Sequence, residues 1–225
     1  MKAASFDYHA PPTVESAVAL LQRFDSEGLD AKVLAGGQSL MPMLNMRIAR
    51  PQVLIDLGRI GALDYIRAEG EEIAIGAMTS KRAAEDSALI KAHQPLFHAA
   101  TRLIGHLPVR NRGTVGGSFA HADPAAEYPA VALAQDLQMK AQGPNGTRLI
   151  AAQDFFVTFM TTSLEASEVL TEVRADKDLR YRIASIEQMP MRLALTFGVS
   201  LARIPPLPRT VVSRVSRPPA SAGLV

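Results

Sequence analysis

The sequence contains no cysteine and no tryptophan, and only 5% of its 225 residues are aromatic. Without cysteine the chain cannot form disulfides, use a thiolate nucleophile, or bind zinc or an iron–sulfur cluster through sulfur. No apolar run reaches the roughly 18 residues of a membrane-spanning helix, and residues 1–6 lack the apolar core of a signal peptide. We therefore expect a soluble, cytoplasmic protein without a membrane span, and any cluster redox chemistry must belong to another chain.

Charge is unevenly distributed, although the net charge is only +2. Residues 179–225 contain seven arginines, no lysine and one acid, Glu187, so this segment carries about +6. It lacks lysine clusters and offers only Tyr181 and Phe197 for stacking on bases, so no nucleic-acid partner is expected. Its prolines and lack of periodicity predict disorder over 209–225, although 193–201 is an apolar run.

The first third of the chain has the pattern of a small α/β unit. An apolar fraction of 48% is sufficient for a packed core. Residues 6–9 predict a strand, and Thr13 can cap a helix that ends at Gly28. Strands over 32–34 and 53–57 follow, which gives a βαβ-like arrangement.

The later segments are of two kinds. Short runs in which apolar and polar residues alternate are typical of hairpins, and longer amphipathic stretches are typical of helices. Gly70 lies at the bend of the first hairpin. Pro95 interrupts the longest amphipathic stretch, which is expected to form either one helix or two. The predicted elements are hairpins over 63–75 and 137–151, helices over 89–104 and 128–134, and a strand over 168–173. Together with the βαβ-like start, they predict an α+β fold.

Two Gly-Gly loops are the leading candidates for a binding site. Gly36 and Gly37 follow a predicted strand, and Gly116 and Gly117 repeat the pattern further along the chain. In a tight loop consecutive backbone N–H groups can point toward one place, and glycine has no Cβ to block a ligand there. Both loops therefore suit a pyrophosphate. A Gly-Gly pair is more often a structural turn, and neither loop has a Rossmann or P-loop fingerprint.

The other polar candidates have simpler explanations. Arg110 and Arg112 precede the second loop and could neutralise a pyrophosphate, but pairing with acids across a subunit surface is the preferred interpretation. The methionines at 41, 43 and 46 flank the first loop at near-helical spacing and are expected to pack in the core. The histidines lack metal-ligand spacing and are interpreted as ordinary polar residues. They are His9, His93, His98, His106 and His121.

Four segments carry a more specific signal than the glycine pairs. Two are long, AGGQSLMPMLNMRIARPQVLIDL at 35–57 and VRNRGTVGGSFAHADPAAEYPAVALA at 109–134. The opening SFDYHAP and the strand EVLTEVR at 168–174 accompany them. In this order the segments resemble the medium, FAD-binding subunits of molybdenum hydroxylases. That family includes carbon monoxide dehydrogenase and the flavin domain of xanthine dehydrogenase.

The resemblance implies a two-lobed FAD-binding fold of the vanillyl-alcohol-oxidase type. The lobes would span residues 1–60 and 61–174, and an atypical tail at 175–225 would stand in place of the family's C-terminal domain. Glu127 matches a position where the family commonly has aspartate near the flavin's polar chain. The group His121, Asp123 and Glu127 could also coordinate a cation, but it fits the FAD region better. The implied FAD-binding residues are Ala35, Gly36, Gly37, Gln38, Ser39, Leu40, Thr114, Val115, Gly116, Gly117, Ser118, Asp123, Glu127 and Leu170.

The same resemblance implies an electron-transfer role and no catalytic residue on this chain. A partner iron–sulfur small subunit would pass electrons to this chain's FAD, and a molybdopterin large subunit would oxidise the substrate. The expected assembly is a dimer of heterotrimers. Because residues 179–225 do not resemble the family, a truncated or frame-shifted, non-catalytic product stays open, as does a stand-alone flavin reductase.

Overall fold

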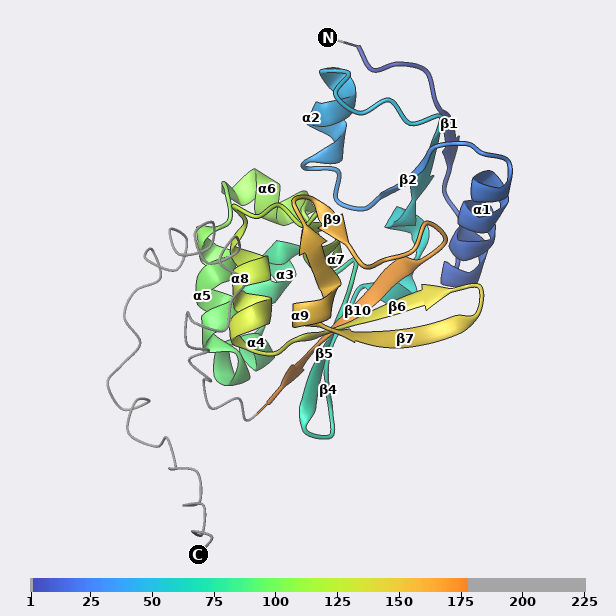
Figure 1. Cartoon of the computed structure of the whole chain (residues 1–225). Coiled ribbons are helices and arrows are strands. Elements are labelled where there is room, and N and C mark those ends of the chain that lie inside the picture. Colours follow the sequence, from blue (N-terminus) through green and yellow to red (C-terminus); the bar gives the residue numbers. More distant parts are fainter. Residues whose placement is uncertain (1, 178–225) are drawn as a thin grey trace, which may run out of the picture.

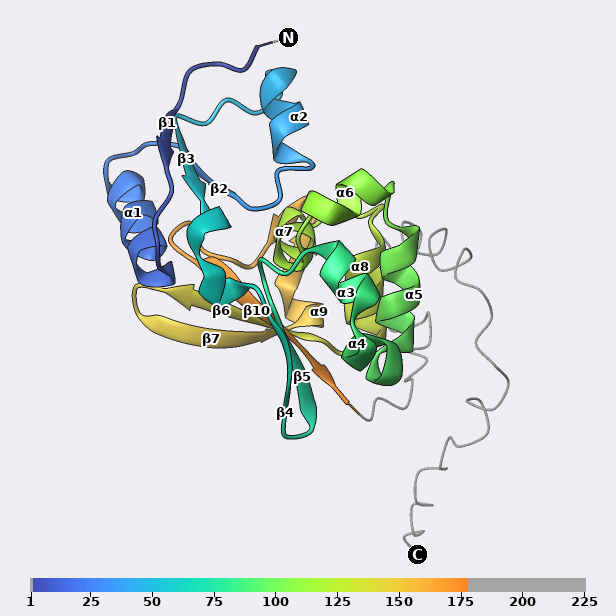
Figure 2. The same ribbon diagram turned by 180° about the vertical axis from the view of Figure 1, so that it is seen from behind.

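The computed structural model describes residues 2–177 and contains a three-stranded sheet, a five-stranded sheet and a two-stranded ribbon. Figure 1 and Figure 2 show helices α3 to α8 on one side of the five-stranded sheet and the smaller sheet with α1 on the other. The predicted α+β class is therefore confirmed. The predictions for the tail beyond residue 177, including disorder and the apolar run at 193–201, lie outside the described residues.

The three-stranded sheet is parallel and is formed by β1 (Asp7–His9), β2 (Ala31–Leu34) and β3 (Val53–Asp56), in the order β1-β3-β2. Thr13 caps helix α1 (Val14–Ser26), and its side chain accepts a hydrogen bond from the backbone N–H of Ser16. The apolar face of the helix is buried against this sheet, as the sequence periodicity predicted. The βαβ-like start is confirmed.

The five-stranded sheet is antiparallel, in the order β4-β5-β10-β6-β7. Both predicted hairpins form, and Gly70 lies at the first bend with a φ of 57°. The sequence did not predict that β10 would enter between the hairpins and join them. The strands are β4 (Ile66–Glu69), β5 (Glu72–Gly76), β6 (Gln138–Gly143), β7 (Gly146–Ala151) and β10 (Val169–Asp176).

A layer of short helices covers one face of this sheet. Pro95 is the first residue of α5, so the predicted amphipathic stretch forms two helices, which decides between the one or two that the sequence left open. The core beneath the helices contains a stack of aromatic rings, with Tyr128 between Phe97 and Phe119 at centroid distances of 4.6 and 5.3 Å. The helices are α3 (Lys81–Asp86), α4 (Ala88–His93), α5 (Pro95–Leu103), α6 (Leu107–Arg112), α7 (Val115–His121) and α8 (Glu127–Ala134).

Two hydrophobic clusters form the core, and β10 contributes to both. Val169 packs with the cluster of α1 and the small sheet, whereas Leu170 packs with the larger cluster under the helices. The lobe boundary after residue 60 stays a prediction. The remaining elements are α2 (Leu40–Asn45), 3-10 turns at Leu57–Arg59 and Gly61–Leu63, α9 (Ala152–Phe155), β8 (Phe156–Thr158) and β9 (Thr161–Thr162). Within residues 2–177 no helix combines the length and the apolar character needed to cross a membrane.

Candidate functional site

The first Gly-Gly loop leaves β2 and turns directly into α2. Gly37 has a φ of 70°, a conformation that favours glycine. Its carbonyl accepts a hydrogen bond from the N–H of Met41, and the carbonyl of Gly36 accepts one from the side-chain amide of Gln38. The backbone N–H groups of residues 36–39 donate no hydrogen bond to any group within residues 2–177. The loop therefore presents consecutive donors that suit an anionic ligand.

The second Gly-Gly loop is arranged differently, because its N–H groups are already used inside the protein. Val115 donates to the carbonyl of Thr79 at 2.9 Å, and Gly116 donates to that of Ala77 at 2.9 Å. The side chain and the carbonyl of Thr114 accept the N–H groups of Gly117 and Ser118, at 3.1 and 3.2 Å respectively. The expectation that both loops present open donors was wrong for this loop, which forms part of the wall of the site.

The two loops lie in direct contact with each other. A Cβ on Gly36 would overlap the carbonyl oxygen of Arg112 and lie 2.9 Å from the backbone nitrogen of Thr114. A Cβ on Gly117 would lie 2.6 Å from Oγ1 of Thr114 and 3.1 Å from the Cβ of Ala35. The glycines are thus required for the close approach of the loops, in addition to any contact with a ligand.

Lys81 is a member of this site that the sequence analysis missed. It is the first residue of α3, and its N–H donates to the carbonyl of Gly113 at 2.8 Å. A Cβ on Gly113 would lie 3.5 Å from Cδ of Lys81 and 3.5 Å from Cγ of Gln38, so both side chains flank Gly113. No sequence signal identified Lys81, because a lone lysine at the start of a predicted helix is usually a solvated residue.

The surroundings of Lys81 are unusual for a cation. The residue is only 7% exposed, and its ammonium lies 5.7 Å from the centroid of the Tyr128 ring. Burial lowers the pKa of Lys81, and the nearby Glu127 carboxylate opposes that shift. Burial also raises the pKa of the Tyr128 hydroxyl well above its ordinary value, which keeps that group neutral.

The other predicted site residues differ in their burial and in their neighbours. Glu127 is half-buried at the start of α8, close to Lys81. Asp123 accepts a hydrogen bond from the N–H of Ala125 at 2.9 Å and so shapes the turn before α8. Leu170, only 5% exposed, packs in the larger core cluster together with Val115. The structure therefore brings the loops, Lys81 and Glu127 together, whereas Leu170 belongs to the packed core next to α7.

Two expectations about residues near the loops were wrong. Arg110 pairs with Glu85 of the same chain at 2.9 Å, not across a subunit surface, and both side chains are 13% exposed. The methionines at 41, 43 and 46 are not buried in the core, since Met41 is 38% and Met46 is 50% exposed and Met43 is half-buried. The reason is that α2 is a short helix in which only Leu44 is buried. Within residues 2–177 no group of three histidines or acids comes together as a metal site.

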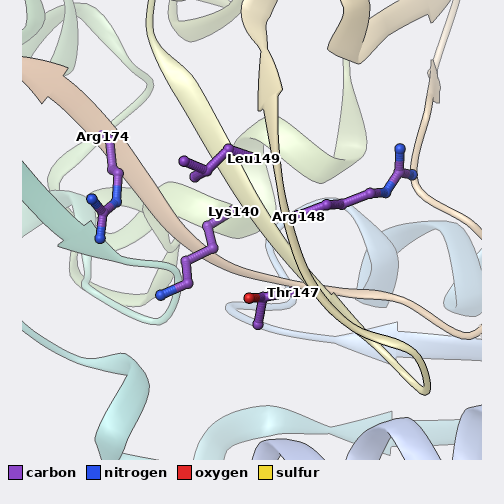
Figure 3. A pocket seen from close by; sticks show the side chains of 5 residues that line it. All are labelled: Lys140, Thr147, Arg148, Leu149 and Arg174. Carbon is purple, nitrogen blue, oxygen red and sulfur yellow. The ribbon is translucent and has the colours of Figure 1, made fainter.

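A hollow of about 380 Å³ lies elsewhere, on strands β6, β7 and β10, and contains none of the predicted site residues. Figure 3 shows Lys140 and Arg174 on one side of the strands and Arg148 directed away from them. Both arginines are already paired, Arg148 with Glu168 and Arg174 with a group of three glutamates. Because its charges are largely neutralised, this hollow is a weaker candidate than the loops.

The family comparison matches the described part of the chain. A family model described as the FAD binding domain in molybdopterin dehydrogenase matches residues 4–175. The carbon monoxide dehydrogenase medium chain of Hydrogenophaga pseudoflava is 46% identical over 169 residues, 75% of this chain and 58% of that protein. The 6-hydroxypseudooxynicotine dehydrogenase complex subunit alpha of Paenarthrobacter nicotinovorans is 43% identical over 173 residues, 77% of this chain and 57% of that protein.

Solved structures of similar proteins share the fold of this chain. A structure of carbon monoxide dehydrogenase from Hydrogenophaga pseudoflava, which lacks the Mo-pyranopterin moiety of its cofactor, has a TM-score of 0.76 and 45% identity. Quinoline 2-oxidoreductase from Pseudomonas putida 86 has a TM-score of 0.74 and 33% identity. Each comparison covers 79% of this chain and 61% of the other. The predicted FAD-binding fold is confirmed, and the chain spans less than two thirds of the length of these proteins.

Proposed function

Because the chain belongs to the family of FAD-binding domains in molybdopterin dehydrogenases, we propose that it is the flavin subunit of a molybdenum hydroxylase. In this role it receives electrons from an iron–sulfur subunit and delivers them to an acceptor through FAD. The observation that carries the proposal is the row of open N–H donors from Gly36 to Ser39, in contact with the second loop.

The residues of the site fit FAD. The N–H groups of the first loop suit the diphosphate, and the side chains of Gln38 and Ser39 can add hydrogen bonds. From the second loop we expect Thr114 and Ser118 to make the polar contacts, since the N–H groups of residues 115–118 are already bonded. The carboxylate of Glu127 is assigned to the polar chain of the flavin, with Asp123 close by in sequence. Leu170 is assigned to an apolar contact near the isoalloxazine.

The flavin, when bound, supplies the redox chemistry, and the chain supplies binding and orientation. Gly36 and its neighbours fix the diphosphate end, while the second loop and α7 hold the first loop in place. No residue of this chain is assigned to substrate oxidation. An iron–sulfur small subunit and a molybdopterin large subunit are the proposed partners, assembled as a dimer of heterotrimers in the cytoplasm. The names of the relatives as medium chains or complex subunits support a place in a multi-subunit complex.

The test is a titration of the purified full chain with FAD, followed by visible flavin absorbance and quenching of flavin fluorescence. Gly37→Asp should abolish binding, because it adds a carboxylate to the loop of open donors and strains a backbone whose φ of 70° favours glycine. Gly28→Asp is the matched control, since Gly28 also has a φ of 70° and nothing lies within 4 Å of that position. A wild-type chain that takes up no FAD would refute the proposal.

Two further measurements separate the alternatives. Co-expression with candidate iron–sulfur and molybdopterin subunits should yield a stable complex if the chain is a subunit. A non-catalytic product would bind FAD without forming that complex. A stand-alone flavin reductase would instead oxidise NADH or NADPH in the presence of free flavin, without either partner.

A further inference from the structure

Lys81 is a largely buried residue whose ammonium has no protein partner within residues 2–177. The residue as a whole is only 7% exposed, and within residues 2–177 its ammonium, which keeps some contact with solvent, makes no salt bridge and no hydrogen bond. Partial desolvation of an unpaired charge costs free energy, so an anionic partner would stabilise this group. Arg110, whose side chain is 13% exposed, has such a partner, since it is paired with Glu85.

The position of Lys81 connects it to both loops. Its backbone N–H binds the carbonyl of Gly113, and Ser80 and Thr114 form a β-bridge beside it. Its stem lies against Gly113 on the same side as Gln38, which belongs to the first loop. The backbone geometry therefore fixes the start of α3 at the junction where the two loops meet.

The charges around Lys81 do not neutralise it. Glu127 is the acid that acts on it, but the two side chains are not within the 4.0 Å of a salt bridge. The Tyr128 ring, at 5.7 Å, provides only a weak electrostatic contact. An anion at the first loop would meet neutral N–H donors, and the stem of Lys81 lies beside that loop, against Gly113 and on the same side as Gln38.

We infer that Lys81 supplies the counter-charge for the diphosphate of FAD at the junction of the two loops. The inference rests on the proposed function. A diphosphate carries two negative charges, and the donors of the first loop are neutral dipoles. A lysine ammonium acts as a point charge on phosphate and can donate three hydrogen bonds. The bound diphosphate would in turn stabilise the ammonium that the apo protein leaves unpaired.

A purely structural role for Lys81 makes a different prediction. If only its stem matters, methionine should replace it without loss, because methionine is unbranched and apolar. If the ammonium binds the diphosphate, the loss should depend on the ligand and appear only with ligands that carry phosphate. The ligand series therefore distinguishes charge from packing.

The experiment compares FAD with riboflavin on the full chain, using Lys81→Met, Lys81→Arg and Lys91→Met. Lys91 lies on the exposed surface of α4 and provides the matched control. Lys81→Met should weaken FAD binding by about tenfold or more, as expected for a lost charge-assisted hydrogen bond, and leave riboflavin binding unchanged. It should also reduce the salt dependence of FAD binding, whereas Lys81→Arg should retain part of the affinity and Lys91→Met all of it.

Three results would overturn the inference. The first is a Lys81→Met protein that binds FAD as tightly as wild type with the same salt dependence. The second is an equal loss for FAD and riboflavin, which would assign Lys81 to the shape of the site. The third is a wild-type chain that binds no FAD, which overturns the proposed function as well. Thermal melting of each apo variant identifies any loss that comes from unfolding.

Discussion

A side chain at Gly36 would collide with the carbonyl oxygen of Arg112, although the two residues belong to different halves of the fold. Gly36 follows β2 of the small sheet, and Arg112 is the last residue of α6 in the helical layer. Their contact is the point at which the small sheet and the helical layer close around the candidate site. The predictions below test this contact and the interactions that hold the second loop and its neighbours in place.

Gly36→Ala should separate the two loops. Its Cβ would lie 2.8 Å from the Cα of Gly113, a distance at which backbone must move. We expect FAD affinity to fall by about tenfold or more, because a misplaced loop loses several of its donors together. Gly61→Ala is the control, since nothing lies within 4 Å of it. FAD titration measures the affinity and thermal melting measures the stability of each variant. A Gly36→Ala protein with the affinity and stability of wild type would contradict the close contact between the loops.

Thr114→Ala should destabilise the second loop without adding bulk. The side chain of Thr114 caps α7 by accepting the N–H of Gly117, and alanine would leave that donor without its partner. The expected cost is about 1 kcal/mol of unfolding free energy, measured by urea denaturation. Thr114→Ser keeps the hydroxyl and should recover most of that stability. Equal stability of the alanine and serine proteins would show that the cap contributes nothing.

Arg110→Met should loosen the link between α6 and α3. Besides pairing with Glu85, Arg110 donates to the carbonyls of Ile104 and Gly105, at 3.1 and 2.9 Å. Removing it leaves the Glu85 carboxylate, which is 13% exposed, with only the longer contact to Arg82 at 3.5 Å, so we expect a loss of about 2 kcal/mol. Arg112→Met is the matched control, because that side chain is exposed and has no ion pair within residues 2–177. A similar loss in both variants would contradict the role assigned to the Arg110–Glu85 pair.

Glu168→Gln should change how stability depends on acid pH. Two hydrogen bonds from Arg148, at 2.7 and 2.8 Å, lower the pKa of the Glu168 carboxyl. Its folded pKa is therefore below its unfolded value of about 4.3. The stabilisation is complete above the unfolded pKa and is lost as the pH falls from there through the folded pKa. Because Arg148 is 44% exposed, we expect only about 1 kcal/mol.

The measurement is the unfolding free energy in urea at several pH values from neutral to acid. Wild type should be more stable than Glu168→Gln at neutral pH, and the two curves should converge as the carboxyl becomes protonated. Glu165→Gln provides the control, because its side chain is exposed. Parallel curves over the whole range would show that the pair does not stabilise the fold.

The sequence by itself determined the local elements and the family. The helix after Thr13, the two hairpins and the helix break at Pro95 all follow from interactions between residues close in the chain, so periodicity and turn chemistry reveal them. The segments around the glycine pairs were specific enough to identify an FAD-binding family, which the family match confirms. The site residues themselves stay predictions.

The tertiary structure alone decided how the site is divided between its parts. The first loop keeps its N–H donors open, whereas those of the second are taken by Thr79, Ala77 and Thr114. Both loops look alike in sequence, because a Gly-Gly pair does not reveal which distant carbonyl will accept its N–H groups. Similarly, Lys81 is buried beside Gly113 only because α3 packs at the junction of the loops. Such pairings depend on contacts between distant segments, which local periodicity does not encode.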